Sequence, residues 1–148
     1  MAYPRYSEAV QLQIRQRANY LCEYCHASEQ WQYVRFTLDH CVPLSSGGSS
    51  DISNLALACF HCNRRKWSKV KGADALTSQV VTLFNPRHGR WNEHFIWSVD
   101  TLSIIGLTAT GRATVDALQL NRERILNIRA ADREVNRHPP SGDPIQRN

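Results

Sequence analysis

The sequence lacks any hydrophobic run of the length that a membrane-spanning helix needs, which is about 18 residues. Its first residues hold no apolar stretch of the kind that forms a secretory signal peptide. No internal repeat is visible, and an odd number of cysteines, five, argues against a framework made of disulfides. We therefore expect a soluble, cytoplasmic protein with no membrane partner.

Length and charge narrow the function only slightly. The 148 residues suit a single domain with a modest core, which a structural metal would help to stabilise. The formal net charge of +5 at pH 7 favours a polyanionic partner. Basic proteins without such a partner are common, so the charge alone does not identify a function.

Four of the five cysteines form two CxxC pairs, Cys22/Cys25 and Cys59/Cys62. A CxxC turn places two sulfurs on one ion, and two such turns fill the tetrahedral shell of zinc. A full shell leaves no position for a catalytic water, so we expect a structural zinc ion. The alternative, four buried or redox-active thiols, is weaker because neither pair lies in a βαβ pattern. Cys41 is either a substitute ligand or, as we prefer, a small buried hydrophobe.

An acid and a histidine, Asp39 and His40, lie between the two pairs. Phosphodiester hydrolysis needs a base that deprotonates water and a charge that offsets the phosphate. His40 suits the base because imidazole titrates near neutral pH, and Asp39 suits Mg²⁺, which prefers carboxylate oxygens. Neighbours on a strand point to opposite faces, so the two share a site only if the strand ends there, as Pro43 suggests. Taken alone, such a dipeptide is more commonly a core histidine paired with a neighbouring acid.

The hydrophobic pattern predicts a mixture of helices and short strands. The expected helices span residues 7–19, 63–70, 73–81, 110–118 and 122–135, and the expected strands span 33–40, 55–59, 94–98 and 102–107. The order strand, loop, strand, helix in the first half makes a unit too small to bury much surface. Zinc would therefore supply a large part of its folding free energy.

These positions together resemble one known family. The chain is similar to HNH endonucleases of the zinc-bearing ββα-metal (His-Me finger) type in the pattern Cys22-x2-Cys25, Asp39-His40-x2-Pro43, Gly47-Gly48, Asn54-Leu55, Cys59-x2-Cys62-Asn63-x2-Lys66. The resemblance covers about the first half of the chain after the leading helix. It implies an α+β fold in which the four-cysteine zinc staples a ββα-metal unit, with flanking helices and a C-terminal hairpin plus helices.

The resemblance implies metal-dependent hydrolysis of DNA phosphodiester bonds. His40 would be the general base, and Asn54 would hold the loop that aims it. Asp39 and Asn63 would hold a catalytic Mg²⁺ or another divalent cation. The family's namesake residue at the second of these positions is His, and Asn is the variant written HNN, whose amide oxygen suits Mg²⁺. His61 is a competing ligand, although a surface role is preferred, and RNA is a further candidate substrate beside DNA.

The resemblance also suggests domain limits. Residues 1–138 would form a single HNH domain, with a core over about 20–71 and an extension over about 72–138 like one found in small bacterial HNH proteins. Residues 139–148, whose prolines cannot continue a helix, would form a disordered tail. Four residues of the extension either widen the substrate cleft or belong, as we prefer, to a hairpin packed on the core: Arg87, His88, Arg90 and His94.

Basic residues follow Asn63 directly. We expect a helix that lies against a nucleic-acid backbone and contacts it through Arg64, Arg65, Lys66 and Lys69. The alternative is a solvated helix face, which is usual for a run of charges. For Trp67 we prefer packing in the core over stacking on a base. The rival function is a zinc-dependent module that binds nucleic acid without cutting it, but mere binding requires no such set of acid, histidine and two asparagines.

Overall fold

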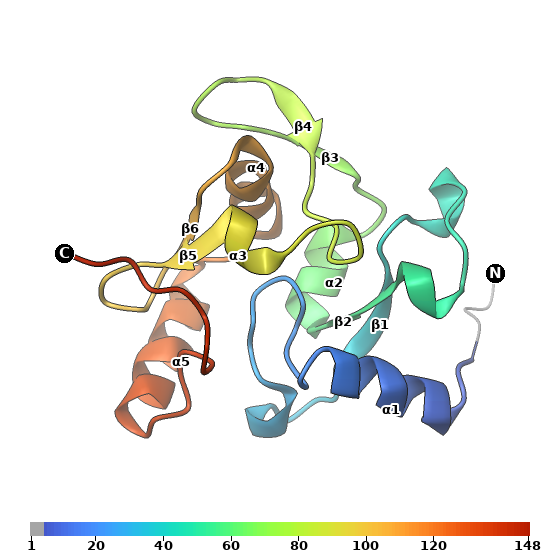
Figure 1. Cartoon of the computed structure of the whole chain (residues 1–148), viewed down its shortest axis with the longest axis horizontal. Coiled ribbons are helices and arrows are strands. Elements are labelled where there is room, and N and C mark those ends of the chain that lie inside the picture. The colour runs from blue at the N-terminus through green and yellow to red at the C-terminus, as the bar shows by residue number, and fades with distance from the viewer. Residues whose placement is uncertain (1–4) are drawn as a thin grey trace. The chain divides into compact units, whose positions relative to one another are not determined.

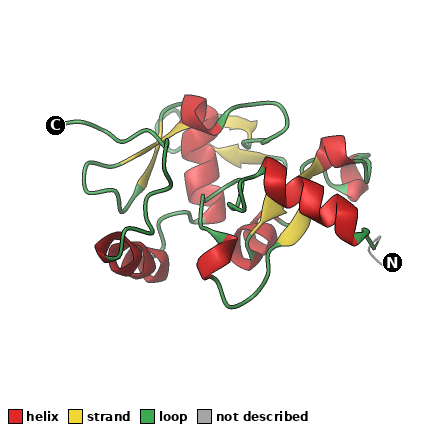
Figure 2. Cartoon of the chain, turned by 60° about the horizontal axis from the view of Figure 1, so that its bottom comes forward, coloured by secondary structure: helices red, strands yellow, loops and turns green. Residues whose placement is uncertain are grey.

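The computed structural model describes residues 5–148. This part of the chain is a mixed α+β structure, as the sequence predicted, with five α-helices and three separate two-stranded ribbons (Figures 1 and 2). The chain divides into two compact units. The first contains the described residues up to Ser68 together with Asn85–His88, and the second contains Lys69–Phe84 and Gly89–Asn148. The boundary lies near the expected limit between core and extension, except that residues 85–88 return to the first unit.

The first unit begins with helix α1 (Glu8–Arg17), which confirms the helix expected over residues 7–19 with slightly shorter ends. Ser7 caps this helix, because its Oγ accepts a hydrogen bond from the backbone N–H of Val10 at 3.2 Å. Such a cap satisfies one of the amides that have no partner within a helix, which is why serine marks helix starts.

A ββα arrangement forms the centre of the first unit. Strand β1 (Thr37–His40) and strand β2 (Leu55–Ala58) pair in an antiparallel ribbon, and helix α2 (Phe60–Lys66) follows directly. Strand β2 is buried along its whole length. Strand β1 begins later than the expected residue 33, because residues 33–35 are exposed and bury no apolar face. Short 3-10 turns occupy the connections, at Glu29–Trp31, Leu44–Ser46 and Ile52–Asn54.

The second unit starts with a hairpin where a helix over residues 73–81 was expected. Strands β3 (Lys71–Ala73) and β4 (Val80–Thr82) pair in an antiparallel ribbon, so that prediction was wrong. The side chain of Asp74 shapes the turn, since its carboxylate accepts hydrogen bonds from the N–H of Leu76 and the hydroxyl of Thr77. The β-branched residues of β4 favour the extended backbone that follows.

The rest of the second unit agrees with the sequence. The expected hairpin is formed by β5 (Phe95–Trp97) and β6 (Ile104–Gly106), and the two expected helices are α4 (Ala109–Leu118) and α5 (Glu123–Glu134). The short helix α3 (Trp91–His94) was not predicted. The core of this unit includes a group of buried aromatic rings: Phe84, Trp91, Phe95 and Trp97.

The C-terminal segment contacts strand β5. The backbone N–H of Trp97 donates to Pro144 O at 3.0 Å, and the N–H of Gln146 donates to Trp97 O at 2.8 Å. The indole N–H of Trp97 also donates to Asp143 at 2.9 Å. The segment therefore pairs with the edge of β5 that β6 leaves open, and unpaired backbone groups at such an edge favour the contact. Within residues 5–148, no helix has the length and apolar character needed to cross a membrane.

Candidate active site

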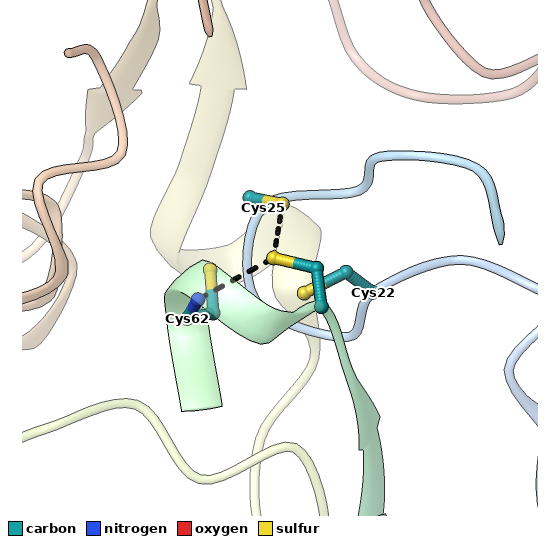
Figure 3. Close-up of side chains that lie close together, drawn as sticks. Cys22, Cys25 and Cys62 are labelled. Carbon is teal, nitrogen blue, oxygen red and sulfur yellow. Dashed lines mark hydrogen bonds between the residues drawn. The ribbon is translucent and has the colours of Figure 1, made fainter. Parts of the chain in front are cut away.

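The two CxxC pairs converge in the first unit. Their four sulfur atoms all lie within 4.8 Å of one another, and none of the cysteines is in a disulfide. Figure 3 shows Cys22, Cys25 and Cys62 gathered beside helix α2. Cys59 caps this helix, and its Sγ accepts a hydrogen bond from the N–H of Cys62 at 3.4 Å. The start of α2 thus holds one pair in position, and the loop after α1 supplies the other.

The geometry of the cysteine cluster fits a zinc ion. Zinc–sulfur bonds of about 2.3 Å in a tetrahedron separate the sulfurs by about 3.8 Å, and Cys25 and Cys59 lie 3.8 Å apart. Burial raises the pKa of Cys22, whereas hydrogen bonds from Cys22 and Cys59 lower the pKa of Cys25 well below its usual value. The cluster includes neither Cys41 nor His61.

Cys41 is confirmed as a small buried side chain. It is almost fully inaccessible to solvent, and burial raises the pKa of its thiol to about 11. A thiol of this kind stays protonated at neutral pH and is a poor metal ligand.

Asp39 is buried at the end of β1, with 4 % of its surface exposed. Its Oδ2 accepts a hydrogen bond from the hydroxyl of Tyr24 at 2.6 Å and lies 3.1 Å from the ammonium of Lys66. Burial raises the pKa of Asp39, and the positive charge of Lys66 opposes that rise. Both contacts are on Oδ2, and the described residues offer Oδ1 no hydrogen bond. One carboxylate oxygen therefore remains for a cation.

Lys66 does not take part in the expected surface for nucleic acid. It is 2 % exposed, and besides the ion pair its Nζ donates a hydrogen bond to the backbone carbonyl of His40 at 2.9 Å. The reason is the buried charge of Asp39, which needs a partner that only a residue on the inner face of α2 can supply. Arg64 and Arg65 are exposed, as expected, and so is Lys69 in the second unit.

His40 is half-buried and contacts two hydroxyl groups. Its Nε2 lies 3.2 Å from the hydroxyl of Tyr6 and 3.2 Å from that of Ser50, whereas its Nδ1 has no hydrogen-bond partner among residues 5–148. Burial lowers the pKa of His40, and the nearby charge of Asp39 opposes that change. The lowered pKa favours the neutral imidazole, whose Nε2 lies beside two hydroxyls and whose Nδ1 has no partner in the described chain.

Asn54 ties together the loop that follows β1. Its Oδ1 accepts from the N–H of Val42 at 2.9 Å, and its Nδ2 donates to Val42 O at 2.9 Å and to Ser49 O at 2.7 Å. Gly48 has no side chain for a physical reason, since a Cβ there would lie 1.8 Å from Val42 O and 2.8 Å from Asn54 Nδ2. These contacts fix the chain just after His40, which is the position that the expected role of Asn54 requires.

Asn63 lies on α2, one helical turn before buried Lys66. Its side chain is half-buried. The preferred core position of Trp67 was wrong, since α2 ends at Lys66 and the chain turns there, which leaves the indole 71 % exposed.

Sequence reasoning missed several contacts of the site. Tyr24 binds Asp39, and Tyr6 and Ser50 contact His40, yet no local pattern marks a hydroxyl for these distant partners. The carboxylate of Glu23 also holds strand β2. It accepts a hydrogen bond from Leu57 N at 2.8 Å and forms an ion pair with Arg87.

Arg87 consequently does not widen a cleft. Its guanidinium is largely buried against Glu23. The segment 85–88 thus contributes to the first unit by an ion pair rather than by presenting a charge to a substrate. His94 has a comparable internal contact in the second unit, where its Nδ1 lies 2.7 Å from the hydroxyl of Thr108.

Comparison with known proteins identifies the segment that carries this geometry. No curated protein and no solved structure matches the chain. The family model described as HNH endonuclease matches residues 22–69. The match begins at the first cysteine of the cluster and includes the ββα arrangement with the Asp39–His40 end of β1. It supports a nuclease-type or nucleic-acid-related function and a nucleic-acid substrate in general. The likeness to this family therefore covers residues 22–69.

Proposed function

We propose that this protein is a metal-dependent endonuclease that hydrolyses DNA phosphodiester bonds at the end of strand β1. One observation carries the proposal. Within the HNH segment, the ammonium of Lys66 contacts both Asp39 Oδ2, at 3.1 Å, and the backbone carbonyl of His40, at 2.9 Å. Lys66 therefore links the carboxylate of Asp39 to the backbone of His40, and the charges of these two residues shift each other's pKa. This supports a shared site, although neighbours on a regular strand point to opposite faces.

His40 is the proposed general base. Its Nε2 lies within hydrogen-bond distance of two hydroxyls, and the proposed tautomer carries the proton on that nitrogen. Nδ1 is then free to take a proton from water. The oxygen of that water attacks phosphorus, the bond from phosphorus to the 3′ oxygen breaks, and the departing 3′ oxygen takes a proton from solvent. The products are a 5′-phosphate and a 3′-hydroxyl. Asn54 supports this role by fixing the backbone at Val42 and Ser49.

Asp39 and Asn63 are the proposed ligands of a divalent cation. The donor set fits Mg²⁺, which commonly binds through one or two protein oxygens plus the phosphate of a substrate. Oδ1 of Asp39 is without a hydrogen bond in the described chain, and Asn63 lies on α2 one helical turn before Lys66. Once bound, the cation would supply positive charge at the phosphate and the leaving oxygen. Arg64, Arg65 and Lys69 are the proposed contacts to the flanking backbone, and the cysteine cluster is the proposed structural zinc site.

A second function has one specific observation in its favour. Lys66 already neutralises Asp39, so a divalent cation would bind next to a positive charge. A domain with weak cation affinity would hold nucleic acid in a zinc-stapled fold without cutting it. The exposed arginines of α2 serve that function equally well.

Plasmid cleavage separates the two functions. We would incubate supercoiled DNA with the zinc-loaded protein, with and without Mg²⁺, beside the variant His40→Ala and the control Ser53→Ala on the exposed turn before Asn54. Cutting that needs both Mg²⁺ and His40 supports the nuclease. Binding without cutting under any divalent cation supports the second function, and cutting by His40→Ala at the wild-type rate contradicts the assignment of the base.

A further inference from the structure

The outer side of α2 carries two exposed aromatic rings with an arginine between them. Phe60 is 62 % exposed and Trp67, the C-cap residue of α2, is 71 % exposed, and Arg64 lies between them in the sequence. Phe60 and Arg64, four residues apart, are neighbours on one face of α2, and Trp67 follows its last turn. We call Phe60, Arg64 and Trp67 the α2 outer stripe. Large aromatic side chains are mostly buried in folded proteins, so two exposed ones on the same helix and its cap indicate a binding surface.

The guanidinium of Arg64 is placed over a ring of the same stripe. Its central carbon lies 6.0 Å from the centre of the Phe60 ring, within the range of a cation–π contact. Arg64 and its neighbour Arg65 have no ion-pair partner among residues 5–148. The first unit's buried acids are already used, in the pairs Glu23–Arg87, Glu29–Arg15 and Asp39–Lys66. The stripe therefore offers flat rings and uncompensated positive charge together.

The backbone of Trp67 is held in an unfavourable conformation. Its φ of 47° and ψ of −119° fall in a region that favours glycine, so a bulky residue there is strained. Burial of the indole does not offset this strain, since the ring is exposed and no described residue packs a ring or a cation on it. The N–H of Trp67 donates to Asn63 O at 2.9 Å, which ties the strained residue to the proposed cation ligand. Strain without a packing gain, next to a site, indicates a functional position.

We propose that the α2 outer stripe binds unpaired nucleotides beside the scissile phosphate, so that the preferred substrate is single-stranded or locally opened nucleic acid. Trp67 and Phe60 stack on bases, and Arg64 contacts the backbone between them. The bases of an intact duplex are stacked on each other and expose no face to a ring, whereas unpaired bases expose theirs. This inference deepens the proposed nuclease function and rests on it only for the position of the scissile phosphate.

Binding measurements on a cleavage-silent chain test the stripe directly. We would use the full zinc-loaded chain carrying His40→Ala and measure fluorescence anisotropy with a labelled DNA strand and with the duplex of the same sequence. Trp67→Ala should weaken single-strand binding by about 5- to 150-fold and leave duplex binding within about twofold, since each stacked base contributes on that scale. Trp67→Phe should retain most of the affinity. Tyr33→Ala, which removes an exposed aromatic ring elsewhere in the first unit, is the matched control and should have no effect.

Trp67→Gly separates binding from folding. Glycine adopts positive φ without strain, so this variant should unfold at a higher temperature than wild type while losing single-strand affinity like Trp67→Ala. Unchanged single-strand affinity in Trp67→Ala and Phe60→Ala, or equal losses on strand and duplex, would overturn the stripe.

Cleavage assays on the chain with intact His40 then distinguish the two proposals. If the Trp67→Ala variant cuts at the wild-type rate in the presence of magnesium, the proposed nuclease function is supported and the proposed role of the α2 outer stripe is contradicted. Single-strand binding through Trp67 with no cutting under any divalent cation would support the stripe and contradict the nuclease.

Discussion

Replacing Lys66 with methionine removes the only cation that the described residues pair with buried Asp39. Methionine keeps much of the length and apolar stem of lysine, so the change isolates the charge. Removing one member of a buried ion pair costs about 3–5 kcal/mol. Protonation of Asp39 limits the loss. Keeping this carboxyl protonated costs about 1.4 kcal/mol for each pH unit above its ordinary pKa of 3.8, or about 4 kcal/mol at pH 7. We therefore expect the free energy of unfolding to fall by about 3–4 kcal/mol at pH 7.

The sign of the pH dependence follows from the same group. In the variant, burial raises the pKa of Asp39 in the folded state without opposition from Lys66, so the folded state binds a proton that the unfolded state releases. Relative to wild type, the Lys66→Met variant therefore keeps its stability below about pH 4. It loses stability as the pH rises toward the raised pKa of Asp39 in the folded state. The deficit at pH 7.5 should exceed the deficit at pH 5.5.

Urea unfolding at these two pH values, with zinc in the same excess for both proteins, measures the effect. Lys69→Met is the control, since Lys69 is exposed and such surface changes fall within about 0.5 kcal/mol. Adding Asp39→Asn to Lys66→Met should remove the pH dependence. Wild-type stability of Lys66→Met at pH 7.5, or an equal deficit at both pH values, would refute the reasoning.

Three further predictions concern other contacts. Asn54→Ala loses three hydrogen bonds to the backbone of Val42 and Ser49 and should lower the free energy of unfolding by about 2–4 kcal/mol in urea, whereas Ser53→Ala should not. Cys59→Ser should release zinc, measured by metal analysis, and unfold the first unit by circular dichroism; a folded, zinc-free variant would contradict the structural zinc. The Arg112 guanidinium holds the pKa of Asp74 well below its ordinary 3.8, so this carboxylate stabilises the fold above about pH 4 and the contribution is lost as the pH falls further. The unfolding temperature of Asp74→Asn should therefore lie below that of wild type at pH 7, and the two temperatures should converge in acid. A difference in unfolding temperature that does not change with pH would contradict this prediction.

Several features of the fold followed from local sequence patterns. Ser7 marks the start of α1 because its hydroxyl needs only the next turn of the same helix. The two CxxC pairs predicted their cluster because the spacing sets the geometry of each turn. The strand–loop–strand–helix order was correct for the same reason, since alternation and turn residues act over a few positions.

Other features depend on partners far along the chain. Lys66 belongs to a run of basic residues that suggests an exposed face, but its ammonium forms a buried ion pair with Asp39 of β1. The limits of α2 decided which residues face the solvent, and ending the helix at Lys66 exposed Trp67. The hairpin over residues 71–82 replaced an expected helix partly because Asp74 pairs with Arg112 of α4. The C-terminal residues, whose prolines exclude a helix, form backbone hydrogen bonds with the open edge of β5.

The sequence by itself determined the chemical inventory: a four-thiol metal cluster, an acid next to a histidine, asparagines on either side of a short strand, and an excess of positive charge. Spacing and residue type are sufficient for these, because each acts within one turn or strand. Only the tertiary structure decided which charges are neutralised, which nitrogen of His40 is held, and which aromatic rings remain exposed. Those outcomes depend on buried charges finding opposite charges and on helix faces meeting strands, and neither is a property of neighbouring residues.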